Sequence, residues 1–290
     1  MADLRNTMLA STSAFRPAPL IRRPTGNRCR PLALAALILA VSILAPQAKA
    51  QRPAQGPMSP TRFTPKQLGY TLYWEDTFNG HQLDPKKWAV RGVGPRALGY
   101  VSPEAVEVGH GCLKLRAFRK DDRILIGAVG SQDTLMTRYG YFECRGRVQH
   151  SSGVWAAFWI QSPQISAGED PAVFGAEIDI MECFRKLGTD IVSHNVHWAY
   201  GPHQQTTHGM QSYRKGVGQG FHTFAVEWTP EKYVFYVDGY KYYEVTQGIS
   251  HIPEYLILSM ELPSNPDDLK HMVLPDVFEV DYVRIYKKAR

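Results

Sequence analysis

Residues 177–182 read E-I-D-I-M-E, and three of these six side chains, Glu177, Asp179 and Glu182, are carboxylates. Their spacing is i, i+2, i+5. In a regular strand the side chains alternate between two faces, so Glu182 would point away from Glu177 and Asp179. In a helix, at about 100° per residue, the three would scatter around the axis. The spacing therefore fits neither regular period.

A β-bulge between Asp179 and Glu182 resolves the spacing. If Ile180 and Met181 together occupy one position opposite the partner strand, the count becomes effectively i, i+2, i+4. All three acids then line one face, while Ile178, Ile180 and Met181 pack against the interior on the other. Because these interleaved apolar residues need a buried face, a solvated strand that carries acids by chance explains the pattern poorly.

Three crowded carboxylates also predict a particular chemistry. Crowding raises the cost of ionising all of them, so at least one pKa should rise. Glycoside hydrolysis uses one ionised carboxylate and one protonated carboxylic acid beside the scissile bond, about 5–5.5 Å apart in a retaining mechanism. A hard-cation site built from the same carboxylates is an alternative that the residues leave open.

Aromatic and histidine side chains flank the acids in the sequence. The stretch S-G-V-W-A-A-F-W-I supplies Trp155 and Trp159, and H-N-V-H-W supplies His197 and Trp198. Sugars present apolar C–H faces that stack on flat rings, so these four residues are candidate substrate-binding residues. Core packing is the commoner role for any one Trp, and the phase of its strand decides between the two.

Other motifs give weaker signals. No G-x-S-x-G elbow is present, which disfavours a serine hydrolase of that type. Four histidines could suggest zinc, but they lack H-E-x-x-H spacing or a cysteine partner. Three arginines could recognise sulfate groups on a galactan, although an exposed strand face is the commoner explanation. The histidines are His194, His197, His203 and His208, and the arginines are Arg138, Arg145 and Arg147.

The first 50 residues have the organisation of a secretory leader. A basic region precedes an apolar run from Pro31 to Ala45, and A-K-A at 48–50 has the small-x-small pattern of a cleavage site. Fifteen residues at 1.5 Å rise span only about 22 Å, short of the roughly 30 Å core of a bilayer. The sequence therefore predicts a signal peptide over residues 1–50, cleavage near Ala50, and a secreted protein, extracellular or periplasmic, without membrane insertion.

The positive charge of the chain belongs to this leader. Residues 1–50 hold seven Lys and Arg and one acid, which accounts for the whole net charge of +6 and leaves 26 basic and 26 acidic residues elsewhere. Near-zero charge does not predict nucleic-acid binding, which needs a basic patch. Cys112, Cys144 and Cys183 remain after cleavage, without C-x-x-C spacing, and are expected to act as small apolar residues in a β core.

The rest of the chain predicts one β domain. Residues 51–64 are rich in Pro and polar residues, which is typical of a flexible linker. From about Leu68, short alternating or aromatic-rich runs are separated by turn residues, and D-G at 238–239 is a strong hairpin signal. The clearest runs are 113–118, 140–148, 154–160, 177–184, 191–198, 222–228, 233–237, 256–260 and 277–286. Residues 65–290 are therefore predicted to form an all-β, antiparallel β-sandwich of the jelly-roll type.

These motifs together carry a resemblance to a known family. E-I-D-I-M-E resembles the active-site motif of glycoside hydrolase family 16, in its bulged, laminarinase-like form. Five further segments resemble strands of that family in the same order, and the resemblance covers most of residues 70–287. They are Y-W-E-D-T-F-N-G (73–80), Y-G-Y-F-E-C-R-G-R-V (139–148), the two strands within 221–239, and V-D-Y-V-R-I-Y (280–286).

The resemblance implies a fold and a set of roles. The fold is a concanavalin A-like jelly roll with an open cleft suited to cutting inside a polysaccharide. Glu177 would be the nucleophile, Glu182 the general acid/base, and Asp179 the residue that orients the nucleophile and modulates its ionisation. The resemblance implies no required cofactor, although many members bind a structural calcium away from the cleft, with an Asp corresponding to Asp281.

The resemblance also implies a substrate class. We expect a monomeric endo-glycosidase acting on a β-1,3- or mixed-linked glucan. A galactan such as agarose, carrageenan or porphyran, transglycosylation, and a non-catalytic carbohydrate-binding protein are alternatives. The chain departs from common family patterns at Ala156, at Gly175 and in L-I-L-S-M-E-L-P (256–263). These departures bear on the substrate and leave the mechanism unchanged.

Overall fold

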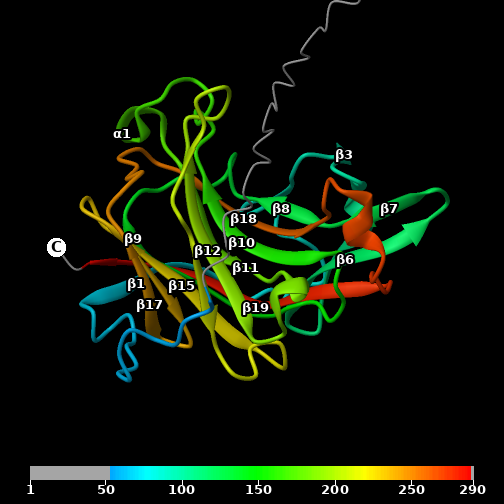
Figure 1. Cartoon of the computed structure of the whole chain (residues 1–290), viewed down its shortest axis with the longest axis horizontal. Helices are drawn as coiled ribbons and strands as arrows, with labels where there is room; N and C mark the ends of the chain where they lie inside the picture. Colours follow the sequence, from blue (N-terminus) through cyan, green and yellow to red (C-terminus); the bar gives the residue numbers. More distant parts are fainter. Residues whose placement is uncertain (1–52, 289–290) are drawn as a thin grey trace, which may run out of the picture. The chain divides into compact units, whose positions relative to one another are not determined.

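The computed structural model describes residues 53–288, which form a sandwich of two β-sheets (Figure 1). The larger sheet has eleven strands in the order β17 (Tyr240–Val245), β16 (Tyr233–Val237), β15 (His222–Trp228), β9 (Gly140–Arg147), β19 (Asp276–Lys288), β6 (Cys112–Lys120), β7 (Arg123–Ile126), β4 (Gly99–Val101) and β3 (Gly94–Arg96), with β1 (Tyr70–Asp76) paired to β19 and β5 (Val106–Gly109) paired to β6. The predicted signal peptide over residues 1–50 lies outside the described residues.

The smaller sheet carries the acids. Its eight strands lie in the order β13 (Gln205–Thr206), β12 (Ile191–Trp198), β11 (Glu177–Glu182), β10 (Trp155–Gln161), β18 (Tyr255–Glu261), β8 (Ala128–Gly130) and β2 (Ala89–Val90), with β14 (Met210–Tyr213) paired to β12. The helices within residues 53–288 are short: α1 (Pro171–Phe174) and 3₁₀ turns at Pro103–Ala105, Arg185–Leu187 and Pro266–Leu269. None of the described helices is long and apolar enough to cross a membrane.

The predicted all-β jelly-roll sandwich is confirmed. The runs 191–198, 222–228 and 233–237 coincide with β12, β15 and β16, and the pairings are antiparallel apart from β4 with β7. The predicted D-G hairpin joins β16 to β17. Asp238 and Gly239 have φ angles of 51° and 76°, as a tight turn between twisted strands requires.

Alternate residues of both sheets meet in one core. Phe158 of β10, Phe142 of β9 and Phe224 of β15 are all fully buried there. Cys144 and Cys183 are buried free thiols, as predicted, whereas Cys112 is half-buried at the start of β6. Burial of these inward faces leaves the outward faces of each strand free to carry polar residues.

The segment 53–64 is held against both sheets. The backbone of Gln55 bonds to β14 through Gln211, and Met58 donates to the carbonyl of Lys241 in β17 at 2.8 Å. Phe63 donates to the carbonyl of Gly239 in the hairpin turn, also at 2.8 Å. The part of the predicted linker that the structure describes is therefore docked along the sandwich rather than free.

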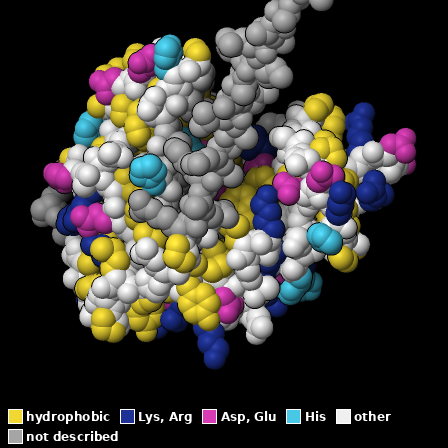
Figure 2. Space-filling view, in the orientation of Figure 1, with side chains coloured by type: hydrophobic (Ala, Val, Ile, Leu, Met, Phe, Trp, Pro, Cys, Tyr) yellow, Lys and Arg dark blue, Asp and Glu magenta, His cyan; other side chains and the backbone are white. Residues whose placement is uncertain are grey.

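The charges on the face seen in Figure 2 are mixed, with Lys and Arg interspersed among Asp and Glu. Ion pairs such as Lys114–Glu107 and Arg116–Glu107 on the strands of the larger sheet reflect this mixing. This distribution agrees with the balance of basic and acidic residues after residue 50.

Replacement of Gly175 by alanine is expected to destabilise the fold more than the same change at Gly69. Gly175 ends α1 just before β11 with φ +80°, and a Cβ there would lie 2.3 Å from Ser162 Cβ and 2.6 Å from Glu254 Oε1. Gly69 has φ +82° and open space around it. Gly69→Ala should therefore cost only the left-handed strain, about 1–2 kcal/mol.

Gly175→Ala should lose about 1–3 kcal/mol beyond that control, because of overpacking. Urea unfolding of both variants gives the two free energies of unfolding. Equal losses would show that the passage between α1 and β11 is not closely packed.

Candidate active site

One residue carries the bulge in β11. In the ladder with β10, the paired residues of β11 run from Met181 directly to Asp179, so Ile180 has no partner. In the ladder with β12, they run from Glu182 directly to Asp179. The predicted bulge between Asp179 and Glu182 is confirmed, and Ile180 is the residue unpaired on both sides.

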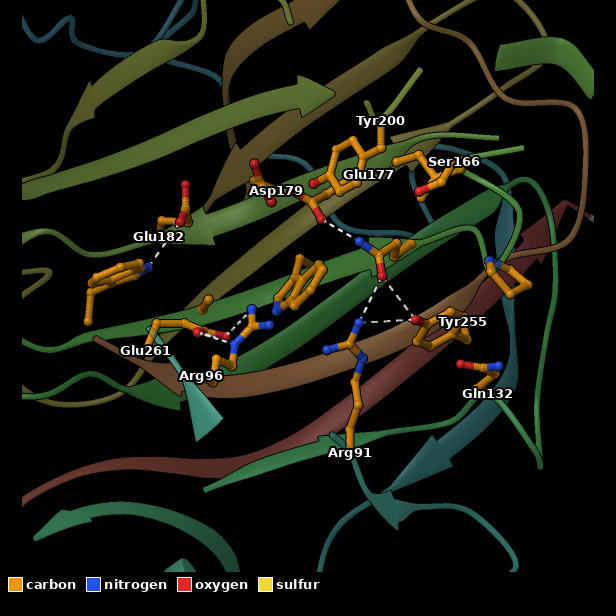
Figure 3. Close-up of a pocket in the computed structure, with 16 residues that line it drawn as sticks. Arg91, Arg96, Gln132, Ser166, Glu177, Asp179, Glu182, Tyr200, Tyr255 and Glu261 are labelled. Atoms are coloured by element: carbon orange, nitrogen blue, oxygen red, sulfur yellow. Dashed lines mark hydrogen bonds and ion pairs between the residues drawn. The ribbon is translucent and has the colours of Figure 1, made fainter. Parts of the chain in front are cut away.

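The bulge brings the three acids to one face. Ile178, Ile180 and Met181 are each 0% exposed and belong to the core between the sheets. Glu177, Asp179 and Glu182 instead line a cleft of about 600 Å³ on the outer face of the smaller sheet. Figure 3 shows Glu177, Asp179 and Glu182 in this order along β11, above the side chains of β10 and β18.

Polar side chains fix the position of Glu177. Gln161, its partner in β10, donates from Nε2 to Glu177 Oε2 at 2.6 Å. The side-chain oxygen of Gln161, Oε1, in turn accepts from Arg91 Nη2 at 2.8 Å and from the Tyr255 hydroxyl at 3.0 Å (Figure 3). Burial, followed by the charge of the nearby Glu177 carboxylate, raises the pKa of the Tyr200 hydroxyl. Glu177 is thus an oriented acceptor at one end of the cleft.

Burial dominates the electrostatics of the other two acids. Asp179 is 6% exposed, and its burial, followed by the charge of Glu177, raises its pKa well above the usual range. His197 Nε2 lies 3.2 Å from Asp179 Oδ2. Burial and then Asp179 likewise raise the pKa of Glu182, while the indole N–H of Trp155, 3.0 Å from Glu182 Oε1, acts in the opposite direction. These surroundings favour the protonated form of Glu182 more than water would.

The two predicted tryptophans of β10 both lie in the cleft. Trp159 is 5% exposed and its indole N–H bonds to Ser259 Oγ at 3.1 Å, while the guanidinium carbons of Arg91 and Arg96 lie 4.9 and 5.9 Å from its ring centroid. Trp155 is less buried and packs against Phe184 with 4.8 Å between ring centroids. Trp155 therefore presents an open ring beside Glu182, and Trp159 forms the floor.

His197 and Trp198 point to opposite faces of β12. His197 pairs with Glu177 across β11 and β12 and points to the same face as the acids. Its neighbour Trp198 points to the opposite face, where its ring packs over Gly248 and Val196 in the core. Because adjacent residues of a strand alternate, the two could not both reach the cleft. Trp198 is therefore a core residue, contrary to its prediction as a substrate-binding residue.

The cleft also contains charged residues that the sequence did not indicate. Arg96 holds Glu261 through two hydrogen bonds, of 2.6 and 3.0 Å. Glu261 belongs to the segment 256–263 that departs from common family patterns. Arg91 lies beside them and makes no ion pair with any carboxylate of residues 53–288. Gln161 could have been found from strand phase, because it follows Trp155 and Trp159 on the same face.

The sequence suggests three possible metal sites: the three acids of β11, the four clustered histidines, and Asp281. Glu177, Asp179 and His197 each offer an atom within 4.8 Å of the others, and they form the one such group in the described part of the chain. The four clustered histidines do not form such a group with each other there. Asp281, which the resemblance associates with calcium, is paired with the guanidinium of Arg145. A site with a cation already bound to its carboxylate does not fit calcium, which needs 6–8 oxygen ligands.

Comparisons with known proteins agree with this geometry. The family model "Glycosyl hydrolases family 16" matches residues 110–268. Glucan endo-1,3-beta-glucosidase A1 of Niallia circulans is 29% identical over 77% of this chain, which spans 39% of that relative's length. Beta-glucanase of Rhodothermus marinus is also 29% identical, over 75% of this chain and 85% of its own length. The X-ray structure of the laminarinase from Rhodothermus marinus superposes with a TM-score of 0.64 and 26% identity, over 76% of this chain and 98% of that one.

Replacement of Trp155 by phenylalanine is expected to raise the pKa of Glu182 further. Two groups favour the ionised form of Glu182, the Trp155 indole N–H and His197, and phenylalanine removes the first while keeping an aromatic ring. ¹³C NMR titration of the Glu182 carboxyl measures the change directly.

Trp159→Phe is the matched control, since that indole donates to Ser259 rather than to an acid. It should leave the titration of Glu182 unaltered. A pKa of Glu182 that falls, or stays constant, in Trp155→Phe would contradict the assignment of this hydrogen bond.

Proposed function

Because the chain belongs to the glycosyl hydrolases family 16, we propose that it is a secreted, monomeric, retaining endo-glycosidase that cleaves β-1,3- or mixed-linked glucan. One observation carries the proposal: Glu177 and Glu182 face the same cleft in contrasting environments. Glu177 is an oriented acceptor of hydrogen bonds, and Glu182 is a partly buried acid with a raised pKa. The names of the glucanase relatives support a β-glucan as the substrate.

The geometry supports a double displacement. Glu182 gives its proton to the glycosidic oxygen while the Glu177 carboxylate attacks the anomeric carbon, so that the leaving sugar departs as an alcohol and a covalent glycosyl-enzyme forms. Glu182, now ionised, then takes a proton from water, whose oxygen attacks the same carbon and releases Glu177. Each step balances with the two carboxyl groups and one water molecule, so we propose that the reaction needs no cofactor.

Asp179 serves this cycle from a position between the two glutamates. Asp179 lies between Glu177 and Glu182 in β11, and its pKa is raised by burial and by Glu177. In its neutral form it places no second charge between the catalytic pair. As Glu177 loses its charge on forming the covalent intermediate, Asp179 can lose a proton more easily, which helps Glu177 leave in the second step.

The aromatic residues of the cleft suit a chain of sugars. Trp155 presents a partly exposed ring beside Glu182, and Tyr200 stands beside Glu177 (Figure 3). Rings on both sides of the acids can stack against successive sugar units, on either side of the scissile bond. This arrangement favours cleavage within a polysaccharide chain rather than at its end.

Glu177→Gln and Glu182→Gln are each expected to lower kcat on laminarin by about 10²–10⁴-fold, since each removes a group that changes charge during the reaction. Glu279→Gln is the matched control, because Glu279 pairs with Arg147 on the larger sheet away from the cleft. Initial rates of reducing-sugar release measure all three. Wild-type rates in either cleft variant, with unchanged melting temperatures, would reject the assignment.

A second candidate substrate is an acidic galactan. Its support is Arg91, whose guanidinium lines the cleft without a carboxylate partner among the described residues. It stacks on the Trp159 ring, and only Nη2 is engaged by Gln161 and Tyr255. A guanidinium with free N–H groups in a cleft is suited to a sulfate ester or a carboxylate.

Initial rates on laminarin, lichenan, agarose and carrageenan separate the two candidates. If the substrate is a neutral glucan, Arg91→Gln should change the rate on laminarin by less than about threefold. If it is a sulfated galactan, the wild type should prefer carrageenan and Arg91→Gln should lose about tenfold or more on it, one charged hydrogen bond being worth about 1.5–3 kcal/mol. Arg116→Gln, on the larger sheet, is the control for a change in net charge.

A further inference from the structure

The bulge in β11 creates a local problem for the backbone. Ile180 is skipped in the ladders with both β10 and β12, and it is 0% exposed. A buried carbonyl at a residue without a ladder partner needs a donor from elsewhere in the fold, because an unsatisfied polar group is costly in the interior. The conformation of the bulge therefore depends on what satisfies the Ile180 carbonyl.

His194 supplies that donor. It lies on β12 opposite the bulge, is 1% exposed, and its Nδ1 lies 2.6 Å from the Ile180 carbonyl oxygen. Its Nε2 lies 2.9 Å from Ser212 Oγ on β14. The ring packs against Phe235 of the larger sheet, with 5.2 Å between centroids. His194 is thus held on three sides inside the sandwich, away from the cleft.

These contacts fix the tautomer of the ring. A carbonyl oxygen can only accept, so Nδ1 must carry the hydrogen that bonds to Ile180. Nε2 is then the acceptor, and the Ser212 hydroxyl donates to it. Burial lowers the pKa of His194 to about 4, which agrees with a neutral ring holding one proton.

We propose that His194 is a positioning residue of the active site: by binding the carbonyl of the inserted Ile180, it holds the bulge in the form that turns Glu182 toward the same cleft as Glu177. Ser212 assists by keeping the proton on Nδ1. The inference rests on the proposed glycosidase function for its role in catalysis, although the effect on the bulge itself does not depend on that function.

Three variants test the role of the ring. His194→Leu removes both polar contacts with little change in volume, and leaves the Ile180 carbonyl without a donor. His194→Asn retains a donor close to the position of Nδ1 and is the rescue variant. Val192→Ala is the matched control: Val192 lies two residues away on the same inward face of β12 and is 0% exposed, but it does not bond to the bulge.

The leaving group of the substrate separates positioning from general structure. A laminari-oligosaccharide needs a proton from Glu182 to release its sugar alcohol, whereas a 2,4-dinitrophenyl β-glycoside releases a stable phenolate without one. If His194 positions Glu182, His194→Leu should lower kcat/KM on the oligosaccharide by about 30-fold or more. The first-turnover release of dinitrophenolate, which precedes the step in which Glu182 activates water, should fall by less than about threefold. His194→Asn should recover part of the loss, and Val192→Ala should lower both rates equally.

Equal losses on the two substrates in His194→Leu would overturn the proposal, because a merely structural role affects both. ¹³C NMR titration of Glu182 supplies a readout that needs no activity. In His194→Leu, or in the milder Ser212→Ala if the leucine variant does not fold, the pKa of Glu182 should fall toward its usual range as the side chain leaves its buried position. An unchanged titration of Glu182 in Ser212→Ala, and in His194→Leu where that variant folds, overturns the inference, whereas an inactive wild type overturns only the proposed function.

Discussion

The unpaired insertion of Ile180 into β11 brings Glu182 to the same face as Glu177 and Asp179. Without it, strict alternation would send Glu182 into the core, where Ile178 and Met181 now pack. Two contacts stabilise the insertion. The apolar side chains of Ile178, Ile180 and Met181 fill the space between the sheets, and the ring of His194 bonds to the Ile180 carbonyl. One inserted residue, Ile180, thus places Glu177, Asp179 and Glu182 in the same cleft.

Contrasting surroundings then give similar side chains different tasks. Glu177 accepts a hydrogen bond from Gln161 at one end of the row. Glu182 is partly buried at the other end, and its pKa is raised first by desolvation and then by Asp179. The same row of carboxylates could not serve as acid and nucleophile if all three shared one environment. The neighbouring strand β10 supplies the difference: Gln161 donates to Glu177 at one end, and the Trp155 indole donates to Glu182 at the other.

The sequence predicted the parts of this arrangement that rest on local alternation. A bulge was required by the three apolar residues that alternate with the acids, Ile178, Ile180 and Met181. The apolar runs of β12, β15 and β16 were long enough for their bounds to be predicted. Trp198 was misplaced because the phase of β12 depends on its register with β11, which no local pattern records. Arg96 and Glu261, far apart in the chain, meet only because distant strands converge. The docking of residues 53–64 was likewise hidden, since a Pro-rich composition indicates little about contacts with strand edges made by other parts of the chain.

The bulge directs Glu177 and Glu182 into one cleft, where we propose that they act as nucleophile and acid on the same glycosidic bond. The stereochemistry of the first product tests it most directly, because a covalent intermediate on Glu177 inverts the anomeric carbon twice. ¹H NMR during the early hydrolysis of a laminari-oligosaccharide resolves the two anomers before they interconvert. We expect the β-anomer to appear first and the α-anomer only by later mutarotation. First appearance of the α-anomer would show a single displacement by water, and would contradict the role of Glu177 as nucleophile.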